Sequence, residues 1–310
     1  MHAFRFAVHE ASAASGEAWL AFARRAEELG YDTLLVPDHL GNQLSPVSAL
    51  AAAAAVTQRL RIGPYVFAND FRHPLVMARE AASLDVLSGG RFELGIGAGW
   101  RTSDYRQLGL PYEAPGRRVD RLVEALPLIL RLLSGETVTH AGARYRLGAA
   151  RIVPRPVQRP RPPLHIGAGG PRMLRLAARH AEIVGFIPQF TTGGRPQLRD
   201  MGEEALARKV EIVRQAAGER FASLELSIYC ADAGMVGGPG QGHGLAGSAF
   251  AAAKELLTAP MASPYLLYGT LGQLRERLER RRDRLGISHY AIPGHVMEEM
   301  APLVNALSGE

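Results

Sequence analysis

The sequence predicts an α/β protein of the (β/α)8 TIM barrel class, and three observations support this prediction. Apolar runs of about four to eight residues alternate with longer segments of helical period, which is the pattern of parallel strands joined by helices. Eight such strand-like runs occur, the number that closes a barrel. The chain has 310 residues. Because α/β barrels of this length commonly fold as one unit, we expect a single domain over residues 1–310.

The first four strand–helix pairs fill the chain up to residue 133. Each predicted helix carries apolar residues along one side, as Trp19 and Phe22 do in the first. Glycines end the helices, with Gly30 after the first and Gly89 after the third. The predicted strands are residues 4–8, 33–36, 61–68 and 91–96, and the predicted helices are residues 17–29, 46–58, 74–87 and 115–133.

The pattern continues in the second half of the chain after an insertion. Residues 136–147 are predicted as a small hairpin, and the proline-rich residues 154–163 as an extended surface connection, because proline fixes φ and lacks an amide donor. A Gly-rich loop is expected at residues 235–247. The remaining predicted strands are residues 164–167, 183–187, 224–229 and 288–292, and the remaining helices are residues 171–179, 200–217, 249–257 and 270–285.

Arginine is the unusual feature of the composition. Lys and Arg number 36 against 30 acids, for a net charge of +6, and only Lys209 and Lys254 are lysines. A nucleic-acid partner would require these charges to gather on one face without carboxylates. Most arginines instead alternate with acids, as in residues 275–284, which is typical of a solvated helix face. We therefore expect no nucleic-acid partner.

The cysteine and histidine content indicates the compartment and excludes several kinds of site. Cys230 is the only cysteine in the sequence, so no intramolecular disulfide or multi-thiolate metal site can form. The ten histidines show no spacing of the HExxH kind, and we expect no metal. No basic N-terminal region precedes an apolar run, and residues 40–58 are too polar to span a bilayer. We expect a cytoplasmic protein without membrane contact.

Candidate functional residues follow the strands, because barrels of this class carry their chemistry at the carboxyl ends of the strands. Asp38 and His39 follow the second predicted strand and place an acid and a base together. Each also has a structural interpretation, since a lone histidine is often packed in a core and an aspartate can cap a turn.

Three further loops are candidates, and two of them follow the third and fourth predicted strands. Residues 65–74 mix aromatic and polar groups on which a planar ligand could stack, although Phe67 and Phe71 could equally be core and Asp70 or Arg72 a helix cap. The Gly-rich residues 95–100 allow a ligand to approach the backbone.

The loop after the fifth predicted strand has the features of a phosphate cradle. In residues 166–172 a glycine turn is followed by Pro171 at the expected first helical position and by Arg172. Free amide groups and the helix dipole both favour an anion at such a position. The spacing matches neither a Walker loop nor a Rossmann fingerprint.

Together these segments resemble the luciferase-like monooxygenase superfamily over essentially the whole chain. Within it, the sequence is most similar to the branch of oxidoreductases that depend on the deazaflavin coenzyme F420. The resemblance implies a bacterial-luciferase-type barrel with a flavin-like ring at its mouth. The stretches that carry it are Pro37-Asp38-His39, Arg72-His73-Pro74, Leu84-Asp85-Val86-Leu87-Ser88-Gly89-Gly90-Arg91, Gly95-Ile96-Gly97-Ala98-Gly99-Trp100, Ile166-Gly167-Ala168-Gly169-Gly170-Pro171-Arg172 and Tyr268-Gly269-Thr270.

The resemblance also implies roles for single residues. It makes His39 the group that handles a proton, with Asp38 orienting it or contacting the ring. It implies a cis peptide between Tyr65 and Val66 and a phosphate site around Arg172, with Arg151 or Arg155 as candidate helpers. The residues assigned to the cofactor are Tyr65, Val66, Ala68, Asn69, Gly97, Ala98, Gly99, Ser103, Gly167, Ala168, Gly169, Gly170, Pro171 and Arg172.

The sequence departs from related dehydrogenases at two points. Trp100 stands where those enzymes carry a second acid–base Glu, and neither lysine is well placed to hold a substrate phosphate, which argues against glucose-6-phosphate chemistry. Trp100, Phe190 and Tyr265 are expected either to shape a substrate pocket or simply to pack.

The resulting functional hypothesis is hydride transfer between coenzyme F420 and a small organic substrate, at an activated C=C, C=N or carbonyl/alcohol group, as in natural-product tailoring. One alternative is an FMN-dependent monooxygenase, and another is a non-catalytic flavin-binding barrel. Luciferase relatives commonly dimerise, so a homodimer is expected in which the alanines of residues 49–55 and the helix at residues 74–84 form the interface, although the alanine-rich helix could instead face the core.

Overall fold

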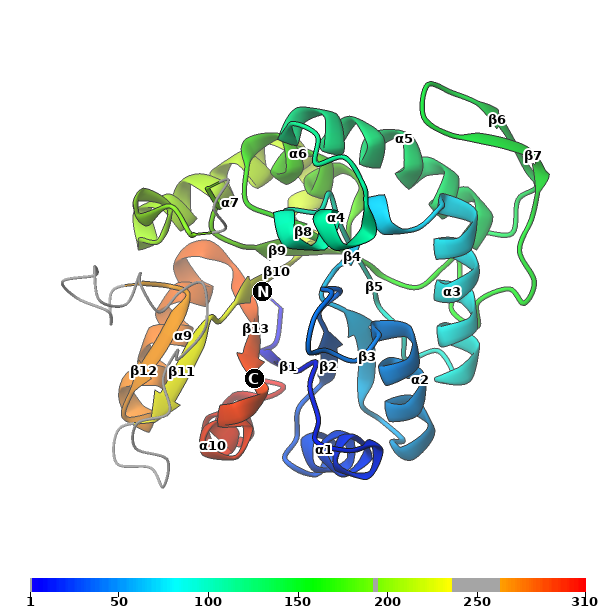
Figure 1. Cartoon of the computed structure of the whole chain (residues 1–310). Coiled ribbons are helices and arrows are strands. Elements are labelled where there is room, and N and C mark those ends of the chain that lie inside the picture. The colour runs from blue at the N-terminus through cyan, green and yellow to red at the C-terminus, as the bar shows by residue number, and fades with distance from the viewer. Residues whose placement is uncertain (1, 192–194, 236–262) are drawn as a thin grey trace. The chain divides into compact units, whose positions relative to one another are not determined.

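Strands and helices alternate along the chain in the computed structural model, as the sequence predicts (Figure 1). The structure describes residues 2–191, 195–235 and 263–310. The predicted helix at residues 249–257 and all but the first residue of the predicted loop at residues 235–247 lie outside the described residues. Among the described helices, none combines the length and apolar composition needed to cross a bilayer.

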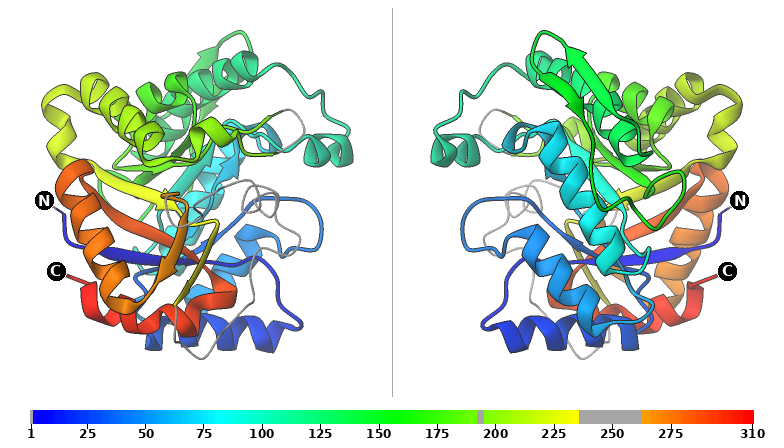
Figure 2. Two further views of the ribbon diagram at one scale, coloured as in Figure 1. Left: turned by 90° about the vertical axis from the view of Figure 1, so that its left-hand side faces the viewer. Right: turned by 90° about the vertical axis from the view of Figure 1, so that its right-hand side faces the viewer.

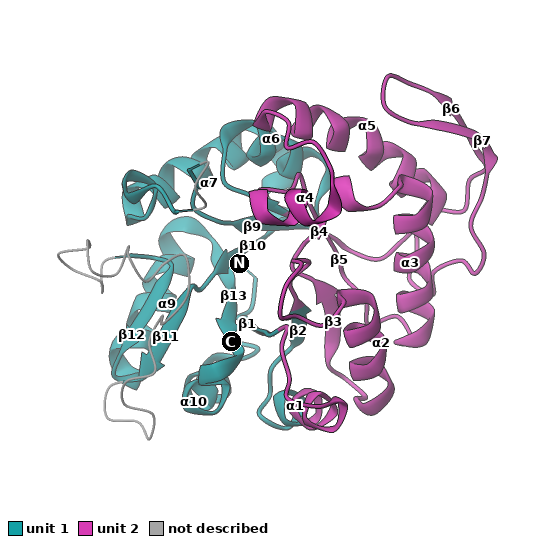
Figure 3. Cartoon of the chain, in the orientation of Figure 1, with its two compact units in different colours: residues 1–10, 25–35, 167–310 teal, residues 11–24, 36–166 magenta. Residues whose placement is uncertain are grey.

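The chain divides into two compact units, and each draws on separate stretches of sequence (Figure 3). Unit 1 comprises residues 1–10, 25–35 and 167–310, and unit 2 comprises residues 11–24 and 36–166. Helix α1 (Gly16–Glu28) contributes residues to both. That residues 1–310 form a single domain stays a prediction.

Unit 1 contains a parallel sheet whose central strands are buried. Its strands are β1 (Arg5–His9), the first three residues of β2 (Thr33–Val36), β9 (Ile183–Phe186), β10 (Glu225–Tyr229) and β13 (Ile287–Pro293). They pair in the order β2, β1, β13, β10, β9. All seven residues of β13 are buried, as expected of a strand covered on both faces. Because every pair is parallel, the carboxyl ends lie at one edge of the sheet.

The helices of unit 1 include one that the sequence analysis did not predict. They are α6 (Pro171–His180), α7 (Glu203–Ala217), α9 (Leu271–Leu285) and α10 (Met297–Leu307). Helix α9 begins with a capping box between Thr270 and Gln273 and ends at Gly286, where φ is +78°. It packs against β13, and the unpredicted α10 packs against α9 (Figure 2).

A second small sheet in unit 1 was also not predicted. Strands β11 (Asp232–Met235) and β12 (Leu266–Gly269) pair in parallel with each other. Each has only four residues and contains a glycine, so neither shows the apolar alternation by which strands are recognised.

Unit 2 contains the helices of the predicted second, third and fourth repeats and the strands of the third and fourth. Its strands β4 (Phe67–Ala68) and β5 (Leu94–Gly97) and the first three residues of β8 (Leu164–Ala168) pair in parallel in that order. The third predicted strand is divided into β3 (Arg61–Pro64) and β4, and the cis Tyr65–Val66 peptide lies at the break, as the resemblance implied. The predicted hairpin is present as β6 (Val138–Ala141) and β7 (Arg146–Ala150).

Besides its part of α1, unit 2 contains four α-helices, and all but the shortest bury one apolar side each. They are α2 (Pro46–Val56), α3 (Pro74–Leu87), α4 (Thr102–Leu108), which was not predicted, and α5 (Pro115–Leu133). On α5, Leu122, Leu126, Ile129 and Leu133 are buried at spacings of three or four residues, and α5 packs against α3.

One arginine of unit 2 has a structural role. The Arg91 guanidinium donates to the carbonyl oxygen of Ala54 at 2.9 Å and to Thr57 Oγ1 at 3.0 Å, at the end of α2. It also donates to the Ser88 carbonyl oxygen at 2.8 Å, at the end of α3. Arginine here satisfies carbonyl groups that helix ends leave unpaired.

Candidate functional site

His39 is held by a buried carboxylate. Its Nδ1 lies 2.7 Å from Oδ2 of Asp104, whose side chain is 1% exposed. The other carboxylate oxygen accepts a hydrogen bond from the Leu40 backbone amide at 3.3 Å. A carboxylate only accepts, so the proton resides on Nδ1 and Nε2 is the nitrogen left for a ligand. The arrangement is that of a histidine oriented for proton transfer.

Asp38, by contrast, does not orient His39. Its carboxylate forms two hydrogen bonds with the Arg72 guanidinium, at 2.5 and 3.0 Å, and accepts the Ala68 backbone amide at 3.0 Å. The expectation that Asp38 orients the histidine is therefore wrong, because Asp104 does so. The other expectation, that Asp38 contacts the cofactor ring, stays a prediction.

Arg72 is shared between two carboxylates. Its Nε lies 3.0 Å from Glu80, and its guanidinium lies over the ring of the buried Phe67. Burial raises the pKa of Glu80 despite the opposing charge of Arg72. Arg72 does not cap α3; the Nδ1 of His73 accepts the Leu75 amide there instead.

The loop after β5 places Trp100 against His39. The two rings meet edge to face, with centroids 5.5 Å apart. The Tyr112 hydroxyl donates to the Trp100 carbonyl oxygen at 2.8 Å. Gly99 has φ +74°, and a Cβ there would lie 2.1 Å from the Tyr105 hydroxyl oxygen. Only glycine fits this position, so the backbone beside Trp100 is closely constrained.

The cofactor residues predicted in unit 2 fall into two groups. Asn69, Ala68 and Gly97 are buried, and the side-chain amide of Asn69 donates to the Tyr145 hydroxyl at 3.1 Å. The Asn69 side-chain oxygen has no hydrogen-bond partner in the described part of the chain. The residues that are only partly buried, and therefore accessible to a ligand, are Tyr65, Val66, Ala98, Gly99 and Ser103.

In unit 1, the loop after β8 has the geometry of an anion site. Gly170 is the extended N-cap of α6, Pro171 is its first residue, and no side chain caps the helix. The first turn of α6 carries no acidic residue, and Arg172 is exposed. Amide groups and the positive end of the helix dipole are thus presented to a phosphate, which fits here. Gly167, Ala168 and Gly169 lead into this turn.

The two candidate helpers lie in unit 2. Arg155 donates to the Gly135 carbonyl oxygen at 2.9 Å, after the end of α5, and Arg151 is exposed. Arg155 therefore already has a structural partner.

Lys209 is buried and fully engaged within unit 1. Its ammonium donates to the Ile187 carbonyl oxygen at 2.7 Å, to Asp200 at 2.6 Å and to the Tyr265 hydroxyl at 3.1 Å. Three bonds exhaust an ammonium group. Burial lowers its pKa, although Asp200 opposes the shift. Lys209 has no donor left for a substrate phosphate, in agreement with the sequence analysis.

The predicted substrate-pocket residues have different surroundings. Tyr265 is fully buried, which favours the packing interpretation for its ring. Phe190 and Trp100 are half-buried and accessible. A substrate role for any of the three stays a prediction, and Lys254 lies outside the described residues.

Sequence reasoning missed a second histidine–aspartate pair, in unit 1. Nε2 of His295 lies 3.2 Å from Oδ1 of Asp232, which is fully buried. The Tyr268 hydroxyl donates to the other carboxylate oxygen. Burial opposes ionisation of Asp232, but hydrogen bonds from His295 and Tyr268 outweigh it and lower its pKa.

His295 lies two residues beyond β13, at the carboxyl edge of the unit 1 sheet. The hydrogen bond to Asp232 raises its pKa, and the charges of Glu10 and Glu299 add to this effect. The signal was available, because His295 follows a predicted strand. Its partners were hidden, since Asp232 and Tyr268 lie on the unpredicted strands β11 and β12.

Among the described residues, no group of three or more His, Cys, Asp or Glu side chains is arranged to hold a metal ion.

Comparison with known proteins gives matches of three kinds. The sequence profile of luciferase-like monooxygenases matches residues 1–233. An F420-dependent glucose-6-phosphate dehydrogenase of Microbacterium testaceum is 39% identical over 187 residues, covering 58% of this chain and 54% of that protein. The 4-hydroxyprotoasukamycin monooxygenase of Streptomyces nodosus subsp. asukaensis is 38% identical over 167 residues, covering 52% and 44% respectively. The chain thus spans about half the length of the curated relatives it matches.

The coenzyme F420 dependent tetrahydromethanopterin reductase of Methanopyrus kandleri superimposes on this chain with a TM-score of 0.79 at 18% identity. The superposition covers 99% of this chain and all of the other. This similarity confirms the predicted (β/α)8 TIM barrel of the luciferase-like type.

Proposed function

Because the chain belongs to the luciferase-like monooxygenase family, we propose that it is an oxidoreductase that transfers a hydride between the deazaflavin coenzyme F420 and a small organic substrate. The relative from M. testaceum supports the choice of cofactor, since it is F420-dependent by name at 39% identity. The observation that carries the proposal is the His39–Asp104 pair, because hydride transfer to a carbonyl, imine or alkene needs a proton partner of this kind.

Two parts of the chain fit such a cofactor. The uncapped start of α6, at Gly170 and Pro171, suits its phosphate, and Arg172 is exposed beside them. The partly buried Tyr65, Val66, Ala98, Gly99 and Ser103 suit its ring system. When bound, the reduced deazaflavin supplies the hydride.

The protein supplies the proton. In the reductive direction His39 first takes up a second proton at Nε2 from solvent and then donates it to the substrate atom next to the carbon that receives the hydride, so a carbonyl becomes an alcohol and the ring returns to its neutral form. The Asp104 carboxylate holds the ring through Nδ1 and stabilises whichever charged form arises. In the oxidative direction the same nitrogen accepts the proton. Because all three donors of Lys209 are engaged within the protein, we favour a substrate whose binding does not depend on a contact between Lys209 and a phosphate group.

Titration of the purified protein with F420 and with FMN tests the proposal. We expect saturable binding of F420 with a dissociation constant in the micromolar range or below, on the order of −8 kcal/mol, and F420-dependent turnover on a panel of enones, imines, ketones and alcohols. Tight FMN binding without affinity for F420 overturns it. Oxygen consumption with reduced FMN then identifies a monooxygenase, and binding without any turnover identifies a flavin-binding barrel.

We propose further that the protein forms a homodimer through α2 and α3 and acts in the cytoplasm. The side of α2 that carries Ala49 and Ala53 is buried, but Val76 and Leu87 on α3 are 46% and 65% exposed. A groove of about 360 Å³ between the two helices is lined by these two side chains, Val47 and Ala51 among others. Light scattering after gel filtration should give a dimer mass, and Val76→Glu should give a monomer. A monomeric wild type rules out this part.

A further inference from the structure

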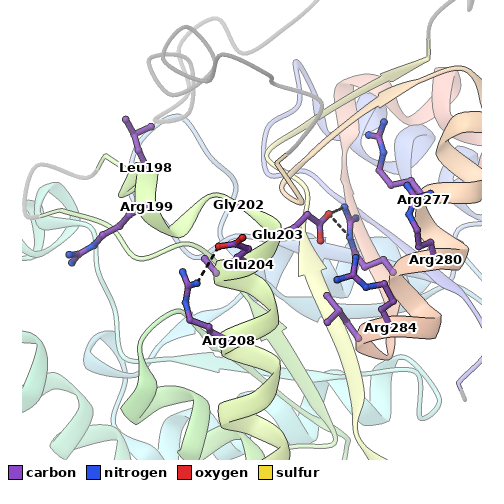
Figure 4. Close-up of a pocket in the computed structure, with 12 residues that line it drawn as sticks. Leu198, Arg199, Gly202, Glu203, Glu204, Arg208, Arg277, Arg280 and Arg284 are labelled. Atoms are coloured by element: carbon purple, nitrogen blue, oxygen red, sulfur yellow. Dashed lines mark hydrogen bonds and ion pairs between the residues drawn. The ribbon is translucent and has the colours of Figure 1, made fainter.

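A groove in unit 1 lies between the first turns of α7 and the second half of α9. Its volume is about 540 Å³, which lies within the range of small-molecule sites. Figure 4 shows Arg277, Arg280 and Arg284 on α9 on one side, with Glu204 and Arg208 on α7 on the other. The arginines that line the groove are Arg199, Arg208, Arg277, Arg280, Arg281 and Arg284.

The groove carries more positive than negative charge. Six guanidinium groups line it against only two carboxylates, those of Glu203 and Glu204. Both carboxylates are already engaged. Arg281 donates to Glu203 through Nε at 3.1 Å, and Glu204 lies 3.8 Å from Arg208. The groove thus has no spare carboxylate to balance its remaining arginines.

Three of these arginines form no ion pair in the described part of the chain, and one of them, Arg199, donates only to the side-chain oxygen of Gln197. Arg277 donates only to the Tyr268 carbonyl oxygen, at 3.1 Å, and Arg284 has no ion pair there. On the same helix Arg275 pairs with Glu279 at 2.8 Å and Arg280 with Glu276 at 2.9 Å. The groove-lining arginines without an ion pair therefore lie on the side of α9 that faces the groove and on the turn before α7.

The spacing of the arginines on α9 adds repulsion between like charges to this shortage of negative charge. Arg277, Arg280, Arg281 and Arg284 are three or four residues apart, so they are neighbours on the helix surface, where like charges repel. Burial lowers the pKa of Arg277, and the charges of Arg281 and Arg280 lower it further. A bound anion would relieve this repulsion.

We propose that the groove between α7 and α9 binds a small molecule through a phosphate or diphosphate group held by Arg277 and Arg284. The planar guanidinium donates two parallel hydrogen bonds to phosphate oxygens, which a lysine cannot do. Leu198 and Leu285 also line the groove and offer apolar surface to the organic part of the ligand. The carboxylates of Glu276, paired with Arg280, and Glu279, paired with Arg275, disfavour an extended nucleic-acid surface along α9.

This site differs from the phosphate loop of the proposed function. The groove is built from α7, α9 and the turn before α7, and no residue of the loop after β8 lines it. The experiment that tests the groove site needs neither F420 nor turnover. A negative result there would not affect the proposed function, and failure of the proposed function would not affect the groove site.

The experiment is calorimetric titration of the protein with inorganic pyrophosphate. We expect one saturable groove site whose affinity falls about tenfold or more in the Arg277→Gln/Arg284→Gln double variant, since that variant loses the charge-assisted hydrogen bonds to the phosphate oxygens. The matched control is Arg275→Gln, on the same helix but paired with Glu279 and outside the groove. It should stay within about twofold of wild type, because a surface ion pair contributes little.

Three outcomes would overturn the proposal. The first is an isotherm that the double variant leaves unchanged while Arg172→Gln abolishes it, which would assign the binding to the loop before α6. The second is equal loss in Arg275→Gln, which would mean general charge attraction. The third is binding of a short DNA duplex that pyrophosphate does not displace. Inorganic phosphate and a nucleoside diphosphate, titrated in parallel, distinguish a free anion from a phosphate ester, and unchanged melting temperatures exclude misfolding.

Discussion

Two histidine–aspartate pairs in the described part of this protein are built from the same groups but differ in which nitrogen they leave for chemistry. His39 binds Asp104 through Nδ1 at 2.7 Å, and His295 binds Asp232 through Nε2 at 3.2 Å. Both carboxylates are buried, whereas the histidine side chains are 21% and 45% exposed. Nε2 lies farther from the backbone than Nδ1, so His39 presents the nitrogen with the longer reach.

The surroundings of the two pairs differ as well. Trp100 covers one edge of His39, whereas His295 lies near the charges of Glu10 and Glu299 in addition to Asp232. Negative charge favours the protonated form of His295. The comparison indicates that a carboxylate alone does not make a histidine a proton-transfer group; the free nitrogen and the neighbouring charges decide its role. The proposed proton transfer therefore rests on His39, and His295 is expected to make a structural contact with Asp232.

The largest expected effect comes from replacing the two histidines in turn. His39→Gln keeps a polar side chain but cannot carry a proton, so F420-dependent turnover should fall about 10²–10⁴-fold. The affinity for F420 should change less than about threefold, because an interaction made only in the transition state is lost. Steady-state kinetics with the best substrate of the panel, together with F420 titration, measure both quantities.

His295→Gln is the matched control for this experiment. It removes a histidine of the same kind from a similar carboxylate, and turnover should remain within about threefold of wild type. If the control loses turnover and His39→Gln retains it, the two assignments must be exchanged.

The second effect concerns the carboxylate behind His39. Asp104→Asn leaves the ring in place but no longer fixes its tautomer, and turnover should fall about 10- to 100-fold, as for other groups that orient a histidine. Asp38→Asn separates this role from simple proximity. It weakens the contact with Arg72 and should lower the free energy of unfolding by about 1–3 kcal/mol, with a smaller change in turnover. Kinetics and urea denaturation of both variants check the distinction; a larger kinetic loss in Asp38→Asn would contradict it.

These residues also show what the sequence could reveal. His39 was predictable because it follows an apolar strand directly, and the position of a strand's end is a local property. Asp104 was not, since it lies 65 residues away on α4, a seven-residue helix without a clear apolar period. Only the folded chain brings His39 and Asp104 together. The sequence alone instead suggests the adjacent Asp38 as the partner of His39.

The same reasoning explains the other successes and failures. The strand and helix order was predictable from periodicity, and the glycine turn before α6 from its composition. Strands β11 and β12 were missed because four residues with a glycine carry no alternation, and with them Asp232 and Tyr268. Arginine roles were hidden too, since the sequence cannot tell that Arg277 lacks a carboxylate whereas Arg275 has one.

A smaller effect tests the constraint on the loop beside His39. Gly99 and Gly109 both have positive φ, +74° and +67°, but only at Gly99 would a Cβ meet another atom. Gly109→Ala should cost about 1–2 kcal/mol of unfolding free energy from backbone strain alone. Gly99→Ala should cost about 1–3 kcal/mol more, because the Tyr105 hydroxyl must move. Urea denaturation measures both.

The Tyr105→Phe background separates strain from collision at Gly99. Removing the hydroxyl should recover part of the extra cost of Gly99→Ala and none of the cost of Gly109→Ala. Equal costs for the two glycine variants would show that the loop beside Trp100 relaxes freely, which would weaken the assignment of His39 as a rigidly held group.

The smallest effect is the pH dependence of stability, and it contrasts two histidines of unit 1. The pKa of His295 is raised by Asp232, so its contribution is present below the unfolded value of 6.5 and is lost as the pH rises through the folded pKa. Burial lowers the pKa of His9 to about 4, so its contribution is present above 6.5 and is lost as the pH falls toward 4. Urea denaturation between about pH 4 and 8 should therefore show His295→Gln flattening the alkaline side of the curve and His9→Gln the acidic side. NMR titration of the two imidazoles provides the direct check, and a His295 that titrates below 6.5 would mean that Asp232 does not hold it as a charged group.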